Sequence, residues 1–376
     1  MVDNISVSNL PASQKVPNTW QSQCGPLQAF LEDPTVTEIM VNGAGKIFVE
    51  QKGIIKKTPA RFDNEQNLLQ LLHAIAKAMG RPLDLEHPLL DGRLPDGSRI
   101  NCVIPPVAVD GPSLTIRKFS REALSYQQLI ASGAMDERMA YFLSCCVQSK
   151  INVLVSGGTG SGKTTLLNVL STFIPQHERI VCIEDTAELK LKNENLVRME
   201  SRPPLDSDPG VSIRTLVINA LRMRPDRIVV GECRGAEAFD MLTAMNTGHE
   251  GSLTTVHSNS ARDTLRRLET MILLSGIEIP YKIIRQNISA TINLIVHASR
   301  CADGQRRVVE IVEVGGMEGD VILSQEIFKW HSSTGFKSMG FVPGFVRHFK
   351  EKGIDFPADF FMDQYTVKQN SHKKRA

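Results

Sequence analysis

No other segment limits the folds open to this chain as tightly as residues 157–164, GGTGSGKT, which match the pattern G-x-x-x-x-G-K-[ST]. This pattern binds phosphate when a strand leads into the loop and a helix leads out of it. The apolar segment INVLV precedes the loop, and the helical segment LLNVLSTF follows it. The sequence therefore predicts a phosphate-binding loop between a buried strand and a helix.

The chemistry expected of this loop is the binding of a nucleoside triphosphate. Glycines let the chain approach a phosphate closely, while backbone N–H groups and the helix N-terminus supply positive potential. Lys163 is expected to reach the β- and γ-phosphates and Thr164 to bind Mg²⁺, so ATP and Mg²⁺ are the predicted cofactors. The residues expected to surround the nucleotide are Gly157, Gly158, Thr159, Gly160, Ser161, Gly162, Lys163, Thr164 and Thr165.

Four β-rich segments alternate with helical segments, which predicts an α/β fold with a parallel sheet. The segments are INVLVSG, RIVCIED, DRIVVGE and GSLTTVHS. Glu184, Asp185 and Glu188 follow the second segment, and Glu232 ends the third. Ligands bind at the carboxyl edge of such sheets, and phosphoryl transfer requires a held metal ion and a positioned water. We therefore expect these carboxylates to meet at the edge that carries the phosphate loop.

Two histidines flank the fourth segment. His257 ends it and is expected at the same edge as Glu184 and Glu232, with His249 in the turn before it. A zinc site would need further ligands, and no suitable cysteine pair is near. Purely structural histidines remain an alternative. The favoured interpretation is a polar sensor that contacts the γ-phosphate, or a group bonded to it.

The pattern of elements divides the chain into a small α+β domain and a larger α/β domain. Alternating strands and the helical segment NLLQLLHAIAKAMG define the first domain, and the strand, loop and helix repeats define the second. The predicted parts are a polar N-terminal tail (1–23), an α+β N-terminal domain (24–120), a linker (121–135), an ATPase-type domain with a C-terminal helical part (136–361) and a basic tail (362–376).

Composition excludes several classes of protein. The first twenty residues hold no continuous apolar region, and the apolar runs are far shorter than the roughly 20 residues of a membrane-spanning helix, so we expect a cytoplasmic protein. Seven cysteines without a C-x-x-C pair argue against a disulfide framework and against zinc. A net charge of +2 and the lack of an aromatic and basic groove pattern make nucleic acid an unlikely partner.

Four blocks together resemble the motifs of one superfamily. GGTGSGKTT, CIEDTAEL, RMRPDRIVVGECRGAEA and NTGHEGSLTTVHSNS are similar to the Walker A, Asp box, Walker B and His box of type II and type IV secretion ATPases. Flanking blocks such as DPTVTEIMVNG and GPSLTIRKF extend the resemblance over most of residues 26–361. They look most like the CpaF-like branch, which drives assembly of tight-adherence (Tad) pili.

This resemblance implies an architecture and a partner set. It implies a RecA-like P-loop ATPase domain preceded by a smaller α+β, PAS-like N-terminal domain, with nucleotide between the two. It also implies a homo-hexamer that lies peripherally at the inner membrane and works on pilus or secretion platform proteins. A type IV secretion channel ATPase, a nucleic-acid translocase and a module that binds nucleotide without hydrolysis are the alternatives.

The resemblance also implies roles for individual residues. Glu184 is the first choice for the carboxylate that orients or activates water, with Glu188 in reserve, and Glu232 acts on the Mg²⁺ side. His249 and His257 form the His box. Arg117 matches an N-terminal-domain arginine expected near the phosphates, a task that suits its fixed charge. The weaker candidates for such an arginine are Arg99, Arg222 and Arg224.

Overall fold

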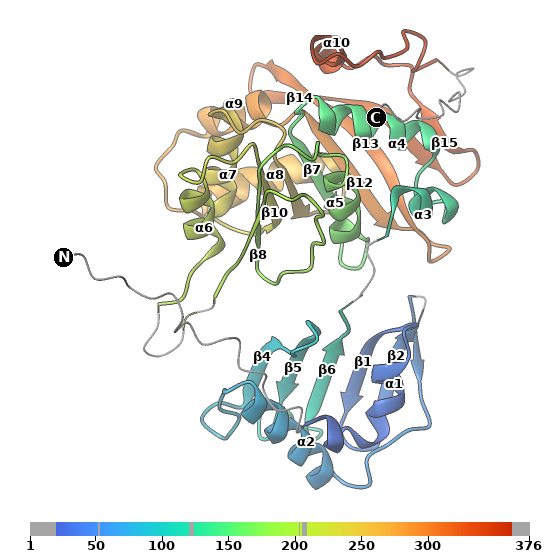
Figure 1. Cartoon of the computed structure of the whole chain (residues 1–376), viewed down its shortest axis with the longest axis vertical. Helices are drawn as coiled ribbons and strands as arrows, with labels where there is room; N and C mark the ends of the chain where they lie inside the picture. Colours follow the sequence, from blue (N-terminus) through green and yellow to red (C-terminus); the bar gives the residue numbers. More distant parts are fainter. Residues whose placement is uncertain (1–19, 52, 120–123, 203, 205–208, 363–376) are drawn as a thin grey trace, which may run out of the picture. The chain divides into compact units, whose positions relative to one another are not determined.

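The chain divides into two compact units, residues 1–122 and 123–376. The computed structural model describes residues 20–51, 53–119, 124–202, 204 and 209–362 (Figure 1). Each unit has its own β-sheet, and separate hydrophobic clusters cover the sheet faces.

The first unit is built on an antiparallel sheet of six strands in the order β3-β2-β1-β6-β5-β4. The strands are β1 (Val36–Asn42), β2 (Ile47–Gln51), β3 (Ile54–Lys57), β4 (Leu89–Arg93), β5 (Arg99–Val103) and β6 (Ser113–Arg117). The helices are η2 (Gln21–Gln23), η3 (Gly25–Leu27), α1 (Gln28–Glu32) and α2 (Glu65–Ala78).

Helix α2 covers one face of this sheet with the apolar positions that its sequence spacing predicts. Asn64 caps the helix by accepting a hydrogen bond of 2.9 Å from the backbone N–H of Asn67. The buried helix residues are Leu68, Leu71, Leu72, Ile75 and Ala76. Trp20 is only 4% exposed and joins the same core, so the polar tail predicted over 1–23 ends earlier than expected. The remainder of that prediction, residues 1–19, lies outside the described residues.

The second unit contains a sheet of nine strands in the order β15-β14-β13-β12-β7-β11-β10-β8-β9. The six strands β12, β7, β11, β10, β8 and β9 run parallel to one another. Strands β13, β14 and β15 extend the sheet beyond β12 with antiparallel pairing. The strands are β7 (Val153–Gly157), β8 (Ile180–Glu184), β9 (Leu196–Glu200), β10 (Arg227–Cys233), β11 (Leu253–His257), β12 (Leu294–Arg300), β13 (Arg306–Glu318), β14 (Val321–His331) and β15 (Gly335–Ser338).

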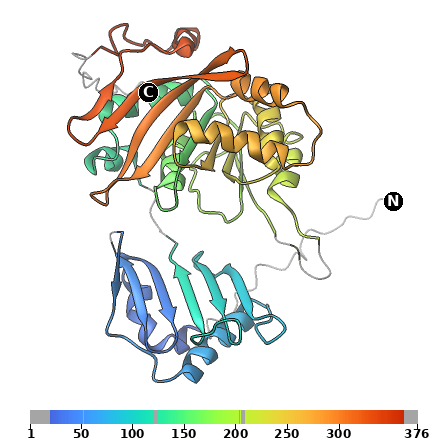
Figure 2. The same ribbon diagram turned by 180° about the vertical axis from the view of Figure 1, so that it is seen from behind.

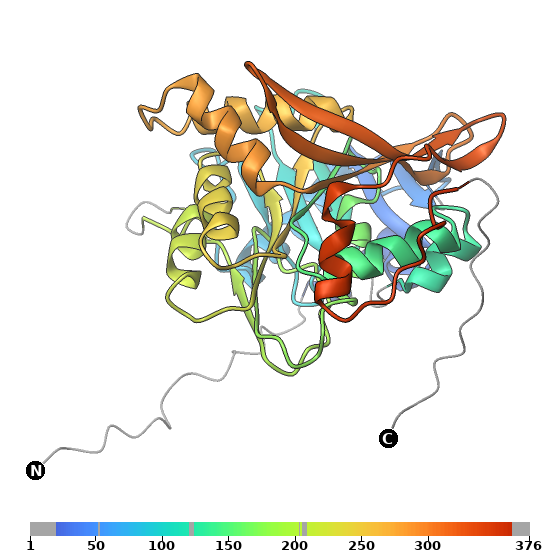
Figure 3. The same ribbon diagram turned by 90° about the horizontal axis from the view of Figure 1, so that it is seen from above.

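Helices cover the two faces of the nine-stranded sheet with separate cores. The elements of the first face are α3 (Tyr126–Ala131), α4 (Glu137–Gln148), α5 (Lys163–Ser171), η4 (Gly344–Val346) and α10 (Arg347–Glu351). The elements of the second face are α6 (Ile213–Ala220), α7 (Glu237–Asn246), α8 (Ala261–Leu273) and α9 (Tyr281–Thr291). Figure 2 shows α8 and α9 lying over the sheet, and Figure 3 shows α10 beside α4, where the Phe142 and Phe349 rings are 6.3 Å apart.

The predicted α/β class and its four parallel strands are confirmed by this topology. The helix predicted from Ser260 is also present, and the Ser260 hydroxyl oxygen accepts a 3.0 Å hydrogen bond from the Asp263 N–H. Beyond Thr291 the described residues form strands β12 to β15 and then η4 and α10. The buried residues of β13 pack onto the two sheet cores, and pairing with β12 and β14 holds this segment as a strand; they are Val308, Ile311, Val312 and Val314.

Two further sequence predictions concern membranes and the C-terminus. Within the described residues, no helix has both the length and the apolar character needed to cross a bilayer. The basic tail predicted over 362–376 lies outside the described residues except for Met362.

Candidate functional site

The predicted phosphate loop, residues 157–164, joins β7 to α5 and has a shape that requires glycine. Gly157 has φ +157°, and a Cβ there would lie 2.3 Å from the carbonyl oxygen of Ala298. Gly162, at φ +94°, is the residue from which α5 begins. Cβ atoms added to Gly158 or Gly160 would instead enter open space. The loop is therefore tight against the sheet on one side and open on the other.

Polar groups of the loop are arranged to receive an anion. The Lys163 ammonium donates a hydrogen bond of 3.0 Å to the carbonyl oxygen of Gly158, so its charge is held at the loop. Ser161 is 3% exposed, and among the described residues its hydroxyl has no hydrogen-bond partner. A buried polar group without a partner is unfavourable, and a bound phosphate would remove that penalty. The loop fits the nucleotide that the sequence predicts.

His257 lies next to the phosphate loop. It ends β11, which is the neighbour of β7, and it is paired in register with Gly157. The backbone N–H of Ser258 donates a 3.3 Å hydrogen bond to the carbonyl oxygen of Gly157. The His257 side chain is exposed, with no hydrogen-bond partner in the described part of the chain. The structure thus puts an available imidazole at the edge where a phosphate would sit.

Glu232 and Asp185 are joined by an arginine that the sequence analysis missed. Arg234 donates hydrogen bonds of 2.9 and 2.6 Å to Glu232 Oε2 and one of 2.9 Å to Asp185 Oδ2. The ends of β8 and β10 therefore meet through one guanidinium, as their parallel pairing allows. Charge-assisted hydrogen bonds of this kind fix geometry strongly. The signal for this residue was its place directly after the Walker B strand.

Glu184, the first choice for a water-activating carboxylate, ends β8 and is buried there. It is 2% exposed, and its Oε2 accepts hydrogen bonds from the backbone N–H groups of Glu188 (2.8 Å) and Leu189 (2.9 Å). A Cβ on Gly231 would lie 3.1 Å from Glu184 Cγ, so the side chain packs under the neighbouring strand. Burial raises the pKa of Glu184 above its usual value. Its bonds hold the loop after β8.

Glu188 lies on the loop after β8, whose backbone N–H groups are bonded to Glu184. The Glu188 side chain is half-buried. The same loop is attached to the helix that follows the phosphate loop, because Asn168 Oδ1 accepts a 2.7 Å hydrogen bond from the Lys190 N–H. The axes of β10 and β8 are about 10 and about 14 Å from β7 at the usual strand spacing. A side chain on the loop after β8 is therefore better able to reach the phosphate loop after β7 than a side chain on β8 itself.

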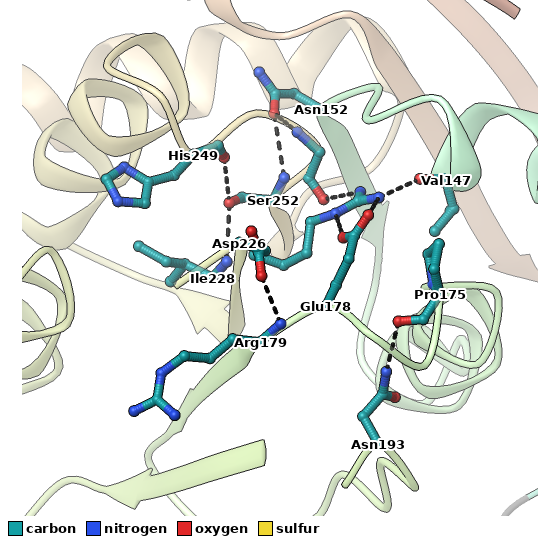
Figure 4. A network of polar contacts seen from close by, with 12 residues as sticks. Val147, Asn152, Pro175, Glu178, Arg179, Asn193, Asp226, Ile228, His249 and Ser252 are labelled. Carbon is teal, nitrogen blue, oxygen red and sulfur yellow. Dashed lines mark hydrogen bonds and ion pairs between the residues drawn. The ribbon is translucent and has the colours of Figure 1, made fainter. Parts of the chain in front are cut away.

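His249 lies in the turn before β11, as the sequence predicts, and therefore at the opposite edge of the sheet from His257. The five-residue strand β11 separates them, a span of about 16 Å. Figure 4 shows His249 beside Ser252 and Asn152, and its ring points away from the bonded groups. Its carbonyl oxygen accepts a 2.7 Å hydrogen bond from the Ser252 hydroxyl. The two histidines of the His box therefore lie at the two ends of one strand.

The arginines predicted near the phosphates lie in different parts of the molecule. Arg222 and Arg224 are exposed and precede β10, so they lie at the edge opposite to the phosphate loop. Arg117 belongs to the first unit, where its Nε is 3.7 Å from Glu38 Oε1. Arg117 is paired across the strands with Arg99. The role predicted for Arg117 at the phosphates stays a prediction.

Two more residues beside the loop were missed. Arg306, the first residue of β13, donates a 2.8 Å hydrogen bond from Nε to the carbonyl oxygen of Gly160. His297 on β12 is buried, and its Nδ1 is 2.9 Å from the hydroxyl of Ser156, directly before the loop. Burial lowers the pKa of His297. Neither residue belongs to a local motif, because both reach the loop only through the sheet.

The fold and the loop define this protein as a P-loop, RecA-like ATPase-type protein with an α+β N-terminal domain. The family profile described as Type II/IV secretion system protein matches residues 21–328. The chain belongs to this family, as the four sequence blocks predict.

Relatives of known name support this assignment. Conjugal transfer protein TrbB of Rhizobium radiobacter is 36% identical over 295 residues, which cover 76% of this chain and 86% of that protein. Type IV secretion system protein VirB11 of Brucella suis biovar 1 is 34% identical over 301 residues, with 72% and 83% covered. The ATPase DotB of Yersinia pseudotuberculosis is similar in structure, with a TM-score of 0.57 at 18% identity and 80% of each chain covered. This last similarity supports the fold alone.

Proposed function

We propose that this chain is the ATP-hydrolysing motor of a secretion or pilus-assembly machine. The observation that carries the proposal is the open glycine loop with Lys163 held at its rim and with His257 and the Glu232 strand end at the same sheet edge. Members of the family act in secretion systems, as their names state. ATP is the ligand proposed for this edge.

Glu188 is proposed as the carboxylate that orients the attacking water. Glu184 is proposed as the residue that positions Glu188. Both oxygens of Glu184 are engaged, since Oε1 is 3.5 Å from Cys182 Sγ and Oε2 accepts two backbone N–H groups. A carboxylate with these bonds is poorly suited to bind a further water. Glu188 lies on the loop that these bonds order, with a half-buried side chain.

Thr164 and Glu232 are the residues proposed for the Mg²⁺ side. Among the described residues, no group of three or more histidine, cysteine or acidic side chains forms a ready metal cage. This fits Mg²⁺, which proteins bind through one or two side chains together with the substrate phosphates. When bound, the ion would neutralise developing phosphate charge. Because Arg234 occupies Glu232 Oε2, we propose that Glu232 acts through a water rather than directly.

Arginines of the first unit are proposed as a second source of positive charge. Arg93, Arg99 and Arg117 are direct cross-strand neighbours on β4, β5 and β6. Arg117 is exposed and also lies opposite Glu38, whose Oε1 is 3.7 Å from the Arg117 Nε. The fixed charge of this exposed arginine supports the phosphate-directed role proposed for it.

Two candidate machines are proposed for this motor. The names of the relatives favour a type IV secretion or conjugal transfer channel. The sequence blocks before the phosphate loop favour a Tad pilus platform. In both cases we propose a homo-hexamer on the cytoplasmic side of the inner membrane. Native mass spectrometry with ATP tests the ring, and identification of the membrane protein that co-purifies from the native host separates the two machines.

Phosphate release tests the proposed hydrolysis. The wild-type chain is expected to release phosphate from ATP only with Mg²⁺, and Lys163→Ala to reduce the rate about a hundredfold, because it removes the charge at the β- and γ-phosphates. Lys352→Ala is the matched control, since Lys352 is exposed beyond α10. A wild-type chain that binds ATP but releases no phosphate would identify a nucleotide-binding module instead.

A further inference from the structure

The loop that follows β8 has no regular secondary structure, so its peptide groups depend on side chains for hydrogen bonds. Among the described residues, neither a helix nor a strand lies between Glu184 and Leu196. The loop nevertheless enters the core on the first face of the sheet, because Leu189 is fully buried there. Buried peptide groups are unfavourable unless they are hydrogen-bonded. The side chains that bond this loop therefore determine its shape.

One of these side chains belongs to β9, the strand next to β8. Arg198 Nη2 donates a hydrogen bond of 3.0 Å to the carbonyl oxygen of Leu189 and one of 3.4 Å to that of Ala187. The parallel register pairs Arg198 with Cys182, which places its side chain on the same sheet face as Glu184, two residues further along β8. Arg198 and Glu184 therefore approach the loop from neighbouring strands on one face.

The two side chains bond opposite kinds of backbone group. Glu184 Oε2 accepts hydrogen bonds from the N–H groups of Glu188 and Leu189. Arg198 donates instead to the carbonyl oxygens of Ala187 and Leu189. The peptide between Ala187 and Glu188 is thus held at its N–H by one side chain and at its carbonyl by the other.

These bonds fix the backbone on both sides of Glu188. The peptide after Leu189 is also held at both ends, because Arg198 bonds its carbonyl and Asn168 accepts a 2.7 Å hydrogen bond from the Lys190 N–H. The two peptides that flank a residue set its φ and ψ, and these angles set the direction of its Cα–Cβ bond. The bonds to the loop therefore orient the Glu188 side chain.

The charge of Arg198 also favours the ionised form of Glu184. Burial raises the pKa of Glu184, and the guanidinium of Arg198, with Nη2 3.9 Å from Glu184 Oε1, opposes this rise. An ionised carboxylate accepts hydrogen bonds from backbone N–H groups more strongly than a neutral one does. Arg198 thus stabilises the loop directly, through two carbonyl groups, and indirectly, through Glu184.

We propose that Arg198 is a positioning residue for Glu188. It orients the Glu188 carboxylate by holding the carbonyl groups of Ala187 and Leu189. This inference rests on the proposed function, because it takes Glu188 to orient the attacking water. It assigns to Arg198 an effect on the rate of hydrolysis, exerted through Glu188, and none on nucleotide affinity.

Steady-state phosphate release by the full chain tests this inference. Arg198→Gln is expected to lower kcat about tenfold, because a misplaced Glu188 orients water poorly, while KM for ATP changes by less than about twofold. Arg198→Lys should recover part of kcat, since it keeps a positive charge and a donor without the fork of the guanidinium. Lys192→Gln is the matched control, because it removes an exposed positive charge from the same connection between β8 and β9, and it should leave both constants unchanged.

A double-mutant cycle distinguishes a positioning role from a general structural one. In a Glu188→Gln background, Arg198→Gln should lower kcat by less than about twofold further, since no carboxylate is left to position. Hydrogen exchange of residues 187–190 should be about threefold faster in Arg198→Gln, with exchange in the strands of the nine-stranded sheet unchanged.

The inference is overturned if the loss of kcat in Arg198→Gln persists in full in the Glu188→Gln background, or if exchange of residues 187–190 is unchanged. A rise in KM without a loss of kcat would also overturn it. If the wild-type chain releases no phosphate, the proposed function fails and the inference fails with it. If the wild type and Arg198→Gln hydrolyse ATP at the same rate, only the present inference fails.

Discussion

The two edges of the nine-stranded sheet use polar residues in opposite ways. At the amino edge, Arg227 is 0% exposed and donates hydrogen bonds to Glu178 and to the carbonyl oxygens of Gly251 and Val147, at 2.8 Å for both carbonyls. Asn152 adds bonds to the Gly251 and Ser252 N–H groups (Figure 4). These polar groups join the starts of four strands and have partners within the chain.

At the carboxyl edge the polar groups are only partly satisfied. His257 is exposed, the Arg234 side chain is 57% exposed, and among the described residues the Ser161 hydroxyl has no partner. Among the described residues, buried polar atoms without a partner also occur at the amino edge, at His249 Nδ1, Ser149 Oγ and Thr291 Oγ1. What distinguishes the carboxyl edge is therefore the exposure of His257 and Arg234 beside an open glycine loop. The buried, bonded residues Arg227 and Asn152 hold the strands together, whereas the exposed His257 and Arg234 remain accessible to a ligand.

The largest effect is expected on stability, from removing the buried ion pair between Arg227 and Glu178 at the amino edge. Arg227→Ala leaves the carboxylate of Glu178 buried without its partner, which should lower the free energy of unfolding by about 3–5 kcal/mol. Urea unfolding followed by circular dichroism measures this loss. Arg222→Ala is the control, because Arg222 is exposed at the same edge, and it should change stability by less than about 0.5 kcal/mol. Equal stability of the two variants would contradict a structural role for this edge.

The second prediction separates two carboxylates of the carboxyl edge. Glu188→Gln should reduce the rate of ATP hydrolysis about a hundredfold with little change in nucleotide affinity, since it removes the group proposed to orient water. Glu184→Gln keeps an oxygen that can accept from the Glu188 and Leu189 N–H groups, so a reduction of less than about tenfold is expected. Steady-state phosphate release and nucleotide binding measure both. The reverse order of rates would return Glu184 to the catalytic role predicted from the sequence.

The smallest effect is expected from the histidines, one at each edge. His257→Ala should slow hydrolysis about tenfold and leave nucleotide affinity unchanged, because its imidazole lies beside Gly157 and has no hydrogen-bond partner among the residues that the structure describes. His249→Ala should keep the rate within about twofold, because strand β11 separates it from the loop. The same two assays check this pair. Similar losses for both variants would show that His249 reaches a nucleotide after all.

Local patterns of the sequence predicted much of this arrangement. The phosphate loop, the four parallel strands and helix α8 with its Ser260 cap were all predicted correctly, because each depends on residues that are close in sequence. The family also followed from four short blocks. The C-terminal strands were missed, because strand pairing depends on distant partners rather than on local spacing.

What the sequence determined by itself is the chemistry available to the chain: a glycine loop between a buried strand and a helix, and acidic and histidine side chains after apolar strands. Only the tertiary structure decided how these side chains are placed. Burial gave Glu184 backbone N–H partners, Arg234 joined the ends of β8 and β10, and the sheet brought Arg306 to the loop. The physical reason is that burial, edge and partner are properties of packed neighbours, which the spacing of residues along a chain does not specify.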